Sequence, residues 1–308
     1  MRAWRRGSRR ELAVLLAILL PAIAGGAEPA GGTASPESAT RVRRFGVVGL
    51  YNPRLMFLKY QPLVDYLSEA TGTSWELVVD SAYQGTVERL CRGELDMALL
   101  GPLTYVRAHR ACGARPLVKL RTGGRETYRS WIMVRQDSPL AGLRDLRGRR
   151  VAFGAALSTS SHLVPEAMLR AAGLEAGTDF SCRFYGHHER AARAVMLRQA
   201  DACAVRDIVG EKFEGRGLRR IAVSDPIPNF PLVVPRDLPA GVAARVMKAL
   251  LELDDNGRGV AWDAELAGGF VPATDEEYGP VRALARQLYG PRALELDERA
   301  WRSRCGGR

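Results

Sequence analysis

Short apolar segments alternate with stretches of helical periodicity along most of this chain, and this alternation limits the fold more than any other feature. The apolar runs predict strands at 45–50, 75–79, 97–100, 130–135, 150–154, 180–185 and 201–205. Apolar residues at helical spacing predict helices around 63–71, 87–91, 165–172, 190–198, 242–253, 276–289 and 292–302. This order is typical of an α/β fold with mainly parallel sheets that carry helices on both faces.

One stretch of this pattern occurs twice. Residues 87–100 and 194–205 each contain a helix, a short turn, an aspartate and a small apolar strand. Because ligands of open α/β sheets bind at the carboxyl ends of strands, two such units suggest two lobes with a ligand cleft between them. The alternative is a chance recurrence of a common α/β module. The expected lobes and hinges are 43–131 plus 229–308 for lobe I, 132–228 for lobe II, and Tyr128–Arg135 and Ser224–Pro231 for the hinges.

The first 27 residues have the pattern of a secretory signal peptide. An arginine-rich start is followed by the apolar run Leu12–Ala24 and then by small residues. The run is shorter than the ~20 residues of a membrane span, although an uncleaved N-terminal anchor is the alternative. Residues 28–42 are rich in Gly, Ala, Ser, Pro and Thr and predict a flexible leader. We therefore expect a periplasmic protein that is not inserted in the membrane after signal removal.

Export bears on the five cysteines, because an oxidising compartment favours disulfides. Their spacing contains no CxxC and no pattern of metal ligands, so we expect no metal site. Two pairings are predicted, Cys91 with Cys112 and Cys182 with Cys203, which leaves Cys305 free. The alternative is that all five are reduced thiols.

A run of hydroxyl residues follows the predicted strand at 150–154. Ser158, Thr159, Ser160 and Ser161 precede Pro165, which marks the start of a helix. Hydroxyls and free backbone N–H groups at a helix start can surround a tetrahedral oxyanion without any lysine. The alternative is a capping loop that binds no ligand.

Other functional classes find less support. The formal net charge is +11, but no basic segment interleaved with aromatic residues accompanies it, so nucleic acid is not an expected partner. Ser160, His188 and Asp207 could form a hydrolytic triad, yet the G-x-S-x-G motif is absent. We therefore expect a protein that is not an enzyme and needs no cofactor.

The chain resembles the periplasmic phosphate-, phosphite- and phosphonate-binding proteins of ABC transporters over about residues 43–260. The motifs that carry this resemblance are Gly93–Pro102, Leu143–Gly154, the Ser158-Thr159-Ser160 run with Pro165, and Gly186–Glu189. The resemblance implies a type II periplasmic-binding fold, with two lobes joined by two crossing hinge segments and a ligand cleft between them.

The resemblance also implies a ligand site. Phosphonate oxygens would contact Ser158, Thr159 and Ser160, with help from His188, and Ser161 stands where the family often has Gly. The family's aromatic wall would correspond to Tyr51, Tyr83 and Tyr105. Arg206, beside Asp207, stands where aminophosphonate binders have an acid, so aminoethylphosphonate is not the expected ligand. A cation there could favour a second anionic group, or Arg206 could be a surface or hinge arginine.

The sequence therefore predicts a monomeric solute-binding protein that captures a small oxyanion by cleft closure and then docks on an ABC transporter permease. Phosphate, phosphite and phosphonates all fit the serine run. A sensor subunit for a membrane signalling partner is the main alternative.

Overall fold

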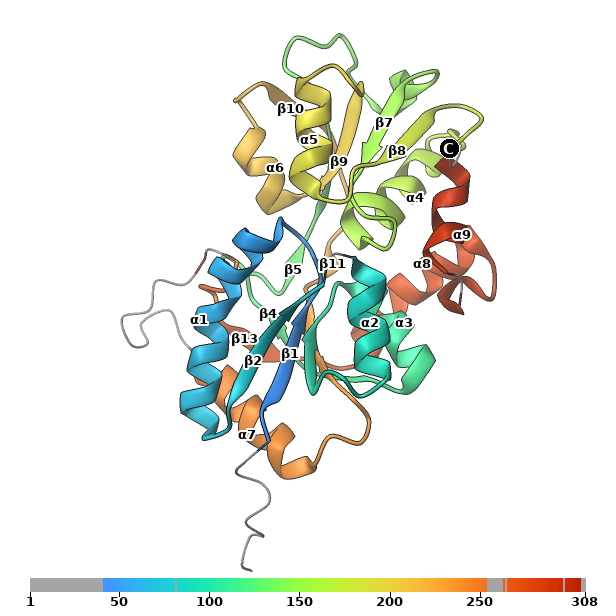
Figure 1. Ribbon diagram of the computed structural model, residues 1–308. Coiled ribbons are helices and arrows are strands. Elements are labelled where there is room, and N and C mark those ends of the chain that lie inside the picture. The colour runs from blue at the N-terminus through green and yellow to red at the C-terminus, as the bar shows by residue number, and fades with distance from the viewer. Residues whose placement is uncertain (1–40, 81, 254–262, 264, 296, 306–308) are drawn as a thin grey trace, which may run out of the picture. The chain divides into compact units, whose positions relative to one another are not determined.

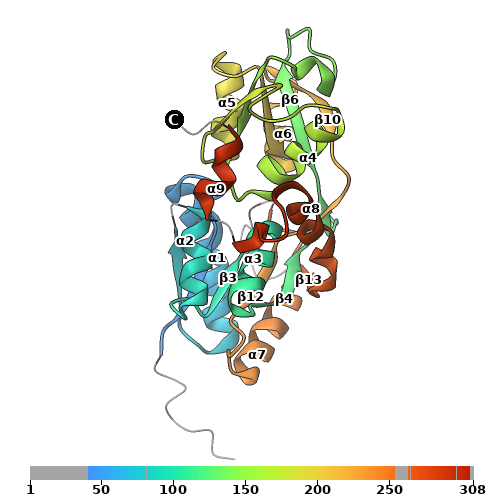
Figure 2. The ribbon, with the colours of Figure 1, turned by 90° about the vertical axis from the view of Figure 1, so that its right-hand side faces the viewer.

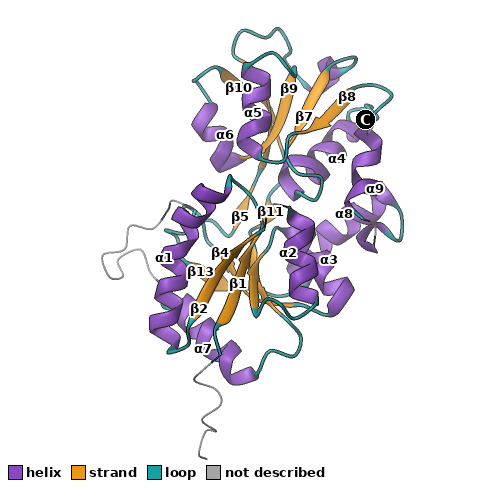
Figure 3. Ribbon diagram, viewed as in Figure 1, coloured by secondary structure: helices purple, strands orange, loops and turns teal. Residues whose placement is uncertain are grey.

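The computed structural model describes residues 41–80, 82–253, 263, 265–295 and 297–305. The expected signal peptide and nearly all of the expected leader lie outside these residues. Two β-sheets, each covered by helices, organise the described part of the chain (Figures 1 and 3). No helix among the described residues is long and apolar enough to cross a membrane.

The first sheet has six strands in the order β13-β4-β12-β3-β1-β2. Helices α1 and α7 pack together on one face, whereas α2 and α3 cover the other (Figure 1). The strands are β1 (Arg43–Val47), β2 (Trp75–Val79), β3 (Met97–Leu99), β4 (Arg115–Leu120), β12 (Pro231–Val234) and β13 (Phe270–Pro272). The helices are α1 (Pro53–Thr71), α2 (Tyr83–Cys91), α3 (Pro102–Cys112) and α7 (Ala240–Leu251).

Helix α1 shows how local sequence sets these boundaries. The Asn52 side chain accepts a hydrogen bond from the Leu55 N–H at 3.0 Å, and Pro53 occupies the first turn. Gly72 ends the helix in the left-handed region at φ 61°, as the sequence predicts. The predicted strand at 75–79 is confirmed residue for residue.

The second sheet has five strands in the order β10-β6-β9-β7-β8. Helices α5 and α6 pack against each other and against its strands, while α4 contacts β6. The strands are β6 (Ser130–Arg135), β7 (Arg150–Phe153), β8 (Ser181–Phe184), β9 (Ala202–Arg206) and β10 (Leu218–Val223). The helices are α4 (Val164–Ala171), α5 (His188–Met196) and α6 (Asp207–Phe213).

Both sheets are mixed, so the expectation of mainly parallel sheets is wrong. Parallel pairing is confined to β1 with β2 and β3, and to β7 with β8 and β9. Strands β6 and β12 pair antiparallel with their neighbours. Each of these two strands comes directly after a segment that crosses from one sheet to the other. It therefore runs opposite to the neighbouring strands of its sheet.

Two short strands form the passage between the sheets. β5 (Thr127–Tyr128) leads from the first sheet to the second, and β11 (Ile227–Pro228) leads back. They pair antiparallel, with Tyr128 opposite Ile227, in the region between the two sheets (Figure 1). Both lie in or beside the segments that the sequence indicates as hinges.

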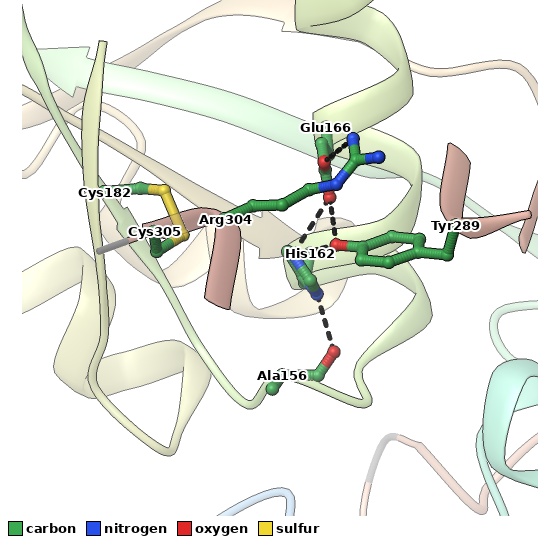
Figure 4. The surroundings of a disulfide bond; sticks show 7 residues. All are labelled: Ala156, His162, Glu166, Cys182, Tyr289, Arg304 and Cys305. Carbon is green, nitrogen blue, oxygen red and sulfur yellow. Dashed lines mark hydrogen bonds and ion pairs between the residues drawn. A yellow bond between two sulfur atoms is a disulfide. The ribbon is translucent and has the colours of Figure 1, made fainter. Parts of the chain in front are cut away.

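Of the two predicted disulfides, Cys91–Cys112 is confirmed and Cys182–Cys203 is wrong. Cys182 is bonded to Cys305 (Figure 4), whereas Cys203 is a buried free thiol. Strand β7 lies between the strands of Cys182 and Cys203, which are therefore about two strand spacings, or ~10 Å, apart. A disulfide needs Cα atoms within about 7 Å, so this pair cannot form.

The C-terminal segment connects the two sheets a third time. Helix α8 (Gly279–Tyr289) contacts both α3 and α4, and α9 (Glu298–Arg302) leads to Cys305 (Figure 2). Arg304 forms an ion pair with Glu166 on α4 at 3.1 Å, and the Tyr289 hydroxyl donates to the same carboxylate (Figure 4). The chain end is therefore held against the second sheet by a covalent bond and buried polar contacts.

Candidate functional site

The serine loop, Ser158–Ser161, lies at the carboxyl end of β7 and is buried throughout. Ser158 precedes a single π-helical turn, Thr159–Leu163, and its Oγ accepts a hydrogen bond from the Ser161 N–H at 3.1 Å. Ser161 Oγ accepts from the Gly154 N–H and donates to the Ala204 carbonyl, both at 2.6 Å. Ser161 therefore ties the loop to β7 and β9, whereas the hydroxyls of Ser158, Thr159 and Ser160 take no part in these two hydrogen bonds.

The loop lies where the two sheets meet. Thr159 Oγ1 accepts a hydrogen bond at 2.9 Å from the backbone N–H of Leu103, at the start of α3 on the first sheet. The Ser160 carbonyl accepts from Ser130 Oγ on β6 at 2.6 Å. Since one partner belongs to each sheet, the loop is a junction between them and is not buried within one lobe.

His188 presents a neutral N–H donor to this loop. Its Nδ1 accepts a hydrogen bond from the Arg206 backbone N–H at 3.0 Å, so the proton of the neutral ring is on Nε2. Nε2 lies 3.4 Å from Ser158 Oγ. Burial, followed by the nearby charges of Arg206 and His187, lowers the pKa of His188 to about 3. An anion at the loop would therefore meet an uncharged imidazole.

Two tyrosines add hydroxyl groups beside the loop. The Tyr83 hydroxyl, from α2 of the first sheet, interacts with the Ser158 side chain. The Tyr128 hydroxyl lies next to the side chains of Thr159 and Ser160 but forms no hydrogen bond within normal geometric limits with any described residue. Burial raises the pKa of both tyrosines well above 10.0, so both hydroxyls keep their protons. The sequence reasoning missed Tyr128 as a site residue, because it assigned this position only to a hinge.

The other two tyrosines of the expected aromatic wall lie differently. Tyr51 is buried between two lysines, with Lys59 Nζ 4.7 Å and Lys212 Nζ 5.2 Å from its ring centroid. Tyr105 donates to Asp275 at 2.6 Å and packs edge-on against Tyr278. The structure therefore places Tyr51 between lysines of α1 and α6 and commits the Tyr105 hydroxyl to Asp275.

Arg206 is neither a surface arginine nor a free cation. Its guanidinium forms an ion pair with Glu265 and donates to Asn229 Oδ1 at 3.0 Å, while its Nε is buried without a hydrogen-bond partner among the described residues. The sequence reasoning missed Glu265, because nothing near it in the chain indicates a buried acid. Asp207 is also occupied, since its carboxylate accepts from the N–H groups of Arg129 and Ile208, both at 2.9 Å.

The arrangement does not have the geometry of a hydrolytic triad. In a triad the acid would accept the Nδ1 proton of the histidine, but His188 Nδ1 accepts the Arg206 N–H. The serine near Nε2 is Ser158, whereas the sequence suggests Ser160. Among the described residues, no group of three or more His, Cys, Asp or Glu side chains could hold a metal ion. What remains is a buried set of neutral hydrogen-bond donors.

Comparison with known proteins points to one family. The family of periplasmic substrate-binding proteins of phosphonate ABC transporters matches residues 45–278. The chain is 29% identical over 302 residues to the phosphate-import protein PhnD of Mycolicibacterium smegmatis, covering 88% of this chain and 92% of that protein. It is 26% identical over 173 residues to the phosphonates-binding periplasmic protein of Escherichia coli, covering 54% of this chain and 51% of that protein.

Solved structures show the same fold. PhnD1 from Prochlorococcus marinus, in complex with methylphosphonate, has a TM-score of 0.73 and 20% identity, with 81% of this chain and 98% of that chain covered. A binding protein component of a phosphonate ABC transporter from Pseudomonas aeruginosa has a TM-score of 0.71 and 19% identity, with 86% and 93% covered. The fold is thus the two-lobed type II fold of periplasmic binding proteins. Because the family match spans most of the chain, this protein belongs to the periplasmic substrate-binding proteins of phosphonate ABC transporters.

Proposed function

We propose that this chain captures a small tetrahedral oxyanion at the serine loop and delivers it to an ABC transporter permease. The observation that carries the proposal is a buried set of donors where the sheets meet, namely the Tyr128 hydroxyl without a partner, His188 Nε2–H and the hydroxyls of Ser158, Thr159 and Ser160. Buried polar groups normally have partners, and an oxyanion would supply one for each of these donors. Charge-assisted hydrogen bonds of about 1.5–3 kcal/mol each make such a set sufficient for tight binding.

The relatives support this ligand class. Two of them are a phosphate-import protein and a phosphonates-binding protein, and one related structure is a complex with methylphosphonate. The hydroxyl and imidazole donors at the carboxyl end of β7 can hold a small anion by their oriented dipoles.

Capture would proceed by closure about the β5–β11 pair. In this proposal residues 43–129 and 229–295 form one lobe and residues 130–228 form the other, because Ser130 and Trp131 pair with β9 of the second sheet. The expected boundary at 131 therefore moves to the start of β6, and residues 297–305 are held to the second lobe by the Cys182–Cys305 bond. The Leu103–Thr159 hydrogen bond and the Arg206–Glu265 ion pair both join residues across the junction, so both belong to the closed state. A ligand that contacts both lobes shifts the equilibrium toward this state by its greater affinity for it.

Transport without chemistry fits the geometry of the site. The neutral His188 has its Nδ1 committed to a backbone N–H, so it lacks the carboxylate partner that orients a general base. Export by the N-terminal segment of 27 residues, action as a monomer and docking on a permease complete the proposed role.

The test is a thermal-shift and calorimetric titration with phosphate, phosphite and methylphosphonate. At least one of these anions should stabilise the protein, and Ser160→Ala should weaken its binding by about tenfold or more. Ser138→Ala is the control, because this serine lies in the turn after β6, outside the serine loop, and its hydroxyl accepts a hydrogen bond from the Leu140 N–H. Absence of stabilisation by all three anions would overturn the proposed ligand class.

A further inference from the structure

A buried ion pair joins the two lobes beside the proposed oxyanion site. The Arg206 side chain, from the carboxyl end of β9, is 2% exposed, and its partner Glu265 is 1% exposed. The second Glu265 oxygen accepts a hydrogen bond from the Tyr60 hydroxyl on α1 at 3.3 Å. Arg206 Nη2 donates to Asn229 at 3.0 Å. Both charges are therefore compensated by groups already in the protein.

Aromatic rings hold the guanidinium in this position. Arg206 Cζ lies 4.6 Å from the ring centroids of both Tyr128 and Phe230, which contact each other edge to face at 5.4 Å. A guanidinium between two rings and two oxygen acceptors cannot turn toward a new partner without losing contacts on several sides.

This pair is directly connected to the serine loop. Tyr128 covers the guanidinium with its ring and places its hydroxyl beside Thr159 and Ser160. The Arg206 backbone N–H holds His188, whose Nε2 faces Ser158. A substituent on an oxyanion bound at the loop would therefore lie close to the ion pair.

The neighbouring charges are paired as well. Lys59 forms an ion pair with Asp263 at 2.5 Å, and Lys212 forms one with Glu189 at 3.4 Å. A charged substituent that reached this region would have to displace an existing partner. Where that partner is Arg206 or Glu265, the displaced group would be a buried, uncompensated charge, which is strongly unfavourable.

We propose that Arg206 and Glu265 together determine specificity and restrict the site to oxyanions without a charged substituent. This inference rests on the proposed function. It predicts acceptance of phosphate, phosphite or a simple alkylphosphonate. A carboxylate-bearing phosphonate would compete with Glu265 for Arg206, and an ammonium-bearing phosphonate would compete with Arg206 for Glu265, so the site disfavours both. The pairing also means that Arg206 is not free to favour a second anionic group.

The first experiment compares three ligands on the wild-type protein by calorimetry. Methylphosphonate should bind at least about tenfold more tightly than either phosphonoacetate or 2-aminoethylphosphonate, because each charged substituent would lie beside a like charge of the ion pair. Binding of either charged analogue as tight as that of methylphosphonate overturns the inference while leaving the proposed function intact. Absence of binding by phosphate, phosphite and methylphosphonate is the separate outcome that defeats the proposed function.

The second experiment removes one charge at a time. Glu265→Gln leaves the Arg206 cation without its partner, so the affinity for phosphonoacetate relative to methylphosphonate should rise by about tenfold or more. Arg206→Gln leaves the Glu265 carboxylate without its partner, so 2-aminoethylphosphonate should gain by a similar factor. Opposite shifts in selectivity are a result that a merely structural ion pair would not produce.

Glu277→Gln is the matched control. Glu277 forms an ion pair with the buried Lys119 in the first sheet, and its loss should leave both affinity ratios unchanged. Thermal melting establishes that each variant is folded, and if one does not fold, the other variant and the wild-type ligand series decide. Unchanged ratios in a folded Glu265→Gln or Arg206→Gln protein would overturn the inference.

Discussion

The imidazole of His188 accepts the backbone N–H of Arg206 at its Nδ1 atom, over 3.0 Å. This single contact sets the tautomer of the histidine, because the proton of the neutral ring must then be on Nε2, on the side of Ser158. It also joins the last residue of β9 to the first residue of α5. The Nε2–H donor of His188 is therefore positioned by the same residue that carries the buried guanidinium.

The buried neutral state of His188 predicts how stability depends on pH. Its pKa is about 3 in the folded protein against 6.5 for the free side chain. As the pH falls below 6.5, the unfolded chain takes up a proton that the folded protein does not, so stability decreases until the pH approaches 3. The loss from this residue should be about 1.4 kcal/mol per pH unit within that window.

Chemical denaturation of the wild type and of His188→Gln at several pH values checks this expectation. Glutamine offers an acceptor and a donor but does not titrate, so the variant should lose less stability than the wild type between about pH 6 and about pH 4. Carboxyl groups with lowered pKa, such as Asp275, contribute the same slope to both proteins and cancel in the comparison. Equal slopes would show that His188 titrates normally when folded.

The disulfide pattern predicts a thiol count. Cys91–Cys112 and Cys182–Cys305 are bonded, so Cys203 is the free thiol. Titration of the denatured, unreduced protein should reveal one reactive thiol, whereas the native protein should show almost none because Cys203 is buried and burial raises its pKa to about 12. Three or five thiols after denaturation would contradict the pairing.

The bond between Cys182 and Cys305 should contribute to stability in particular. It closes a loop with a sequence separation of 123 residues, for which the chain-entropy model predicts about 4–5 kcal/mol. Cys305→Ser should therefore lower the free energy of unfolding by about 2–5 kcal/mol. Cys203→Ala is the control, because it preserves the apolar character of the site and should lower the free energy of unfolding by less than Cys305→Ser. Cys203→Ser is unsuitable because it would bury a hydroxyl. A Cys305→Ser protein as stable as the wild type would argue against the bond.

These disulfides illustrate what the sequence can and cannot predict. Cys91 and Cys112 end neighbouring helices within one local unit, at a separation of 21 residues, so their pairing follows from the order of elements. Cys182 meets Cys305 only because α8 and α9 carry the chain end back to the second sheet. That return depends on tertiary packing, including the buried contacts of Tyr289 and Arg304 with Glu166, which no local pattern encodes.

The candidate site, too, is predicted from the sequence only in part. The serine loop follows from a local pattern, a strand that runs into hydroxyl residues and then into a helix start, and its position at the end of β7 agrees with that expectation. Tyr128 and Glu265 contact Arg206 from segments far away in the chain, so only the assembled fold brings them together. Tyr105 faces Asp275 because the rotation of α3 about its axis is set by packing against α8, which the sequence alone does not fix.

The Leu103–Thr159 hydrogen bond predicts an effect on ligand release. Thr159→Val removes the acceptor of the Leu103 N–H while keeping the shape of the side chain. The N–H would be left unsatisfied in the closed state, at a cost of about 1–3 kcal/mol, and the variant also lacks one of the proposed ligand hydroxyls. Both effects should make the ligand dissociate faster. Stopped-flow measurement of oxyanion release checks this, with Thr178→Val on a surface turn as the control. An unchanged release rate would show that this contact does not separate the two states.

The close approach of β7 to the serine loop predicts a coupled pair of substitutions. A Cβ added at Gly154 would lie 2.7 Å from Ser161 Oγ, so Gly154→Ala must displace the serine or the strand. We expect a loss of stability of about 1–3 kcal/mol, together with weaker oxyanion binding because the loop shifts.

Ser161→Gly removes the obstructing hydroxyl but also its hydrogen bonds to Gly154 and Ala204, so it should be destabilising by itself. In the double variant Ser161 no longer obstructs the new methyl group, and its loss of stability should be smaller than the two single losses together. Denaturation of the four proteins measures this coupling, and strictly additive losses would show that the contact between Gly154 and Ser161 does not position the loop.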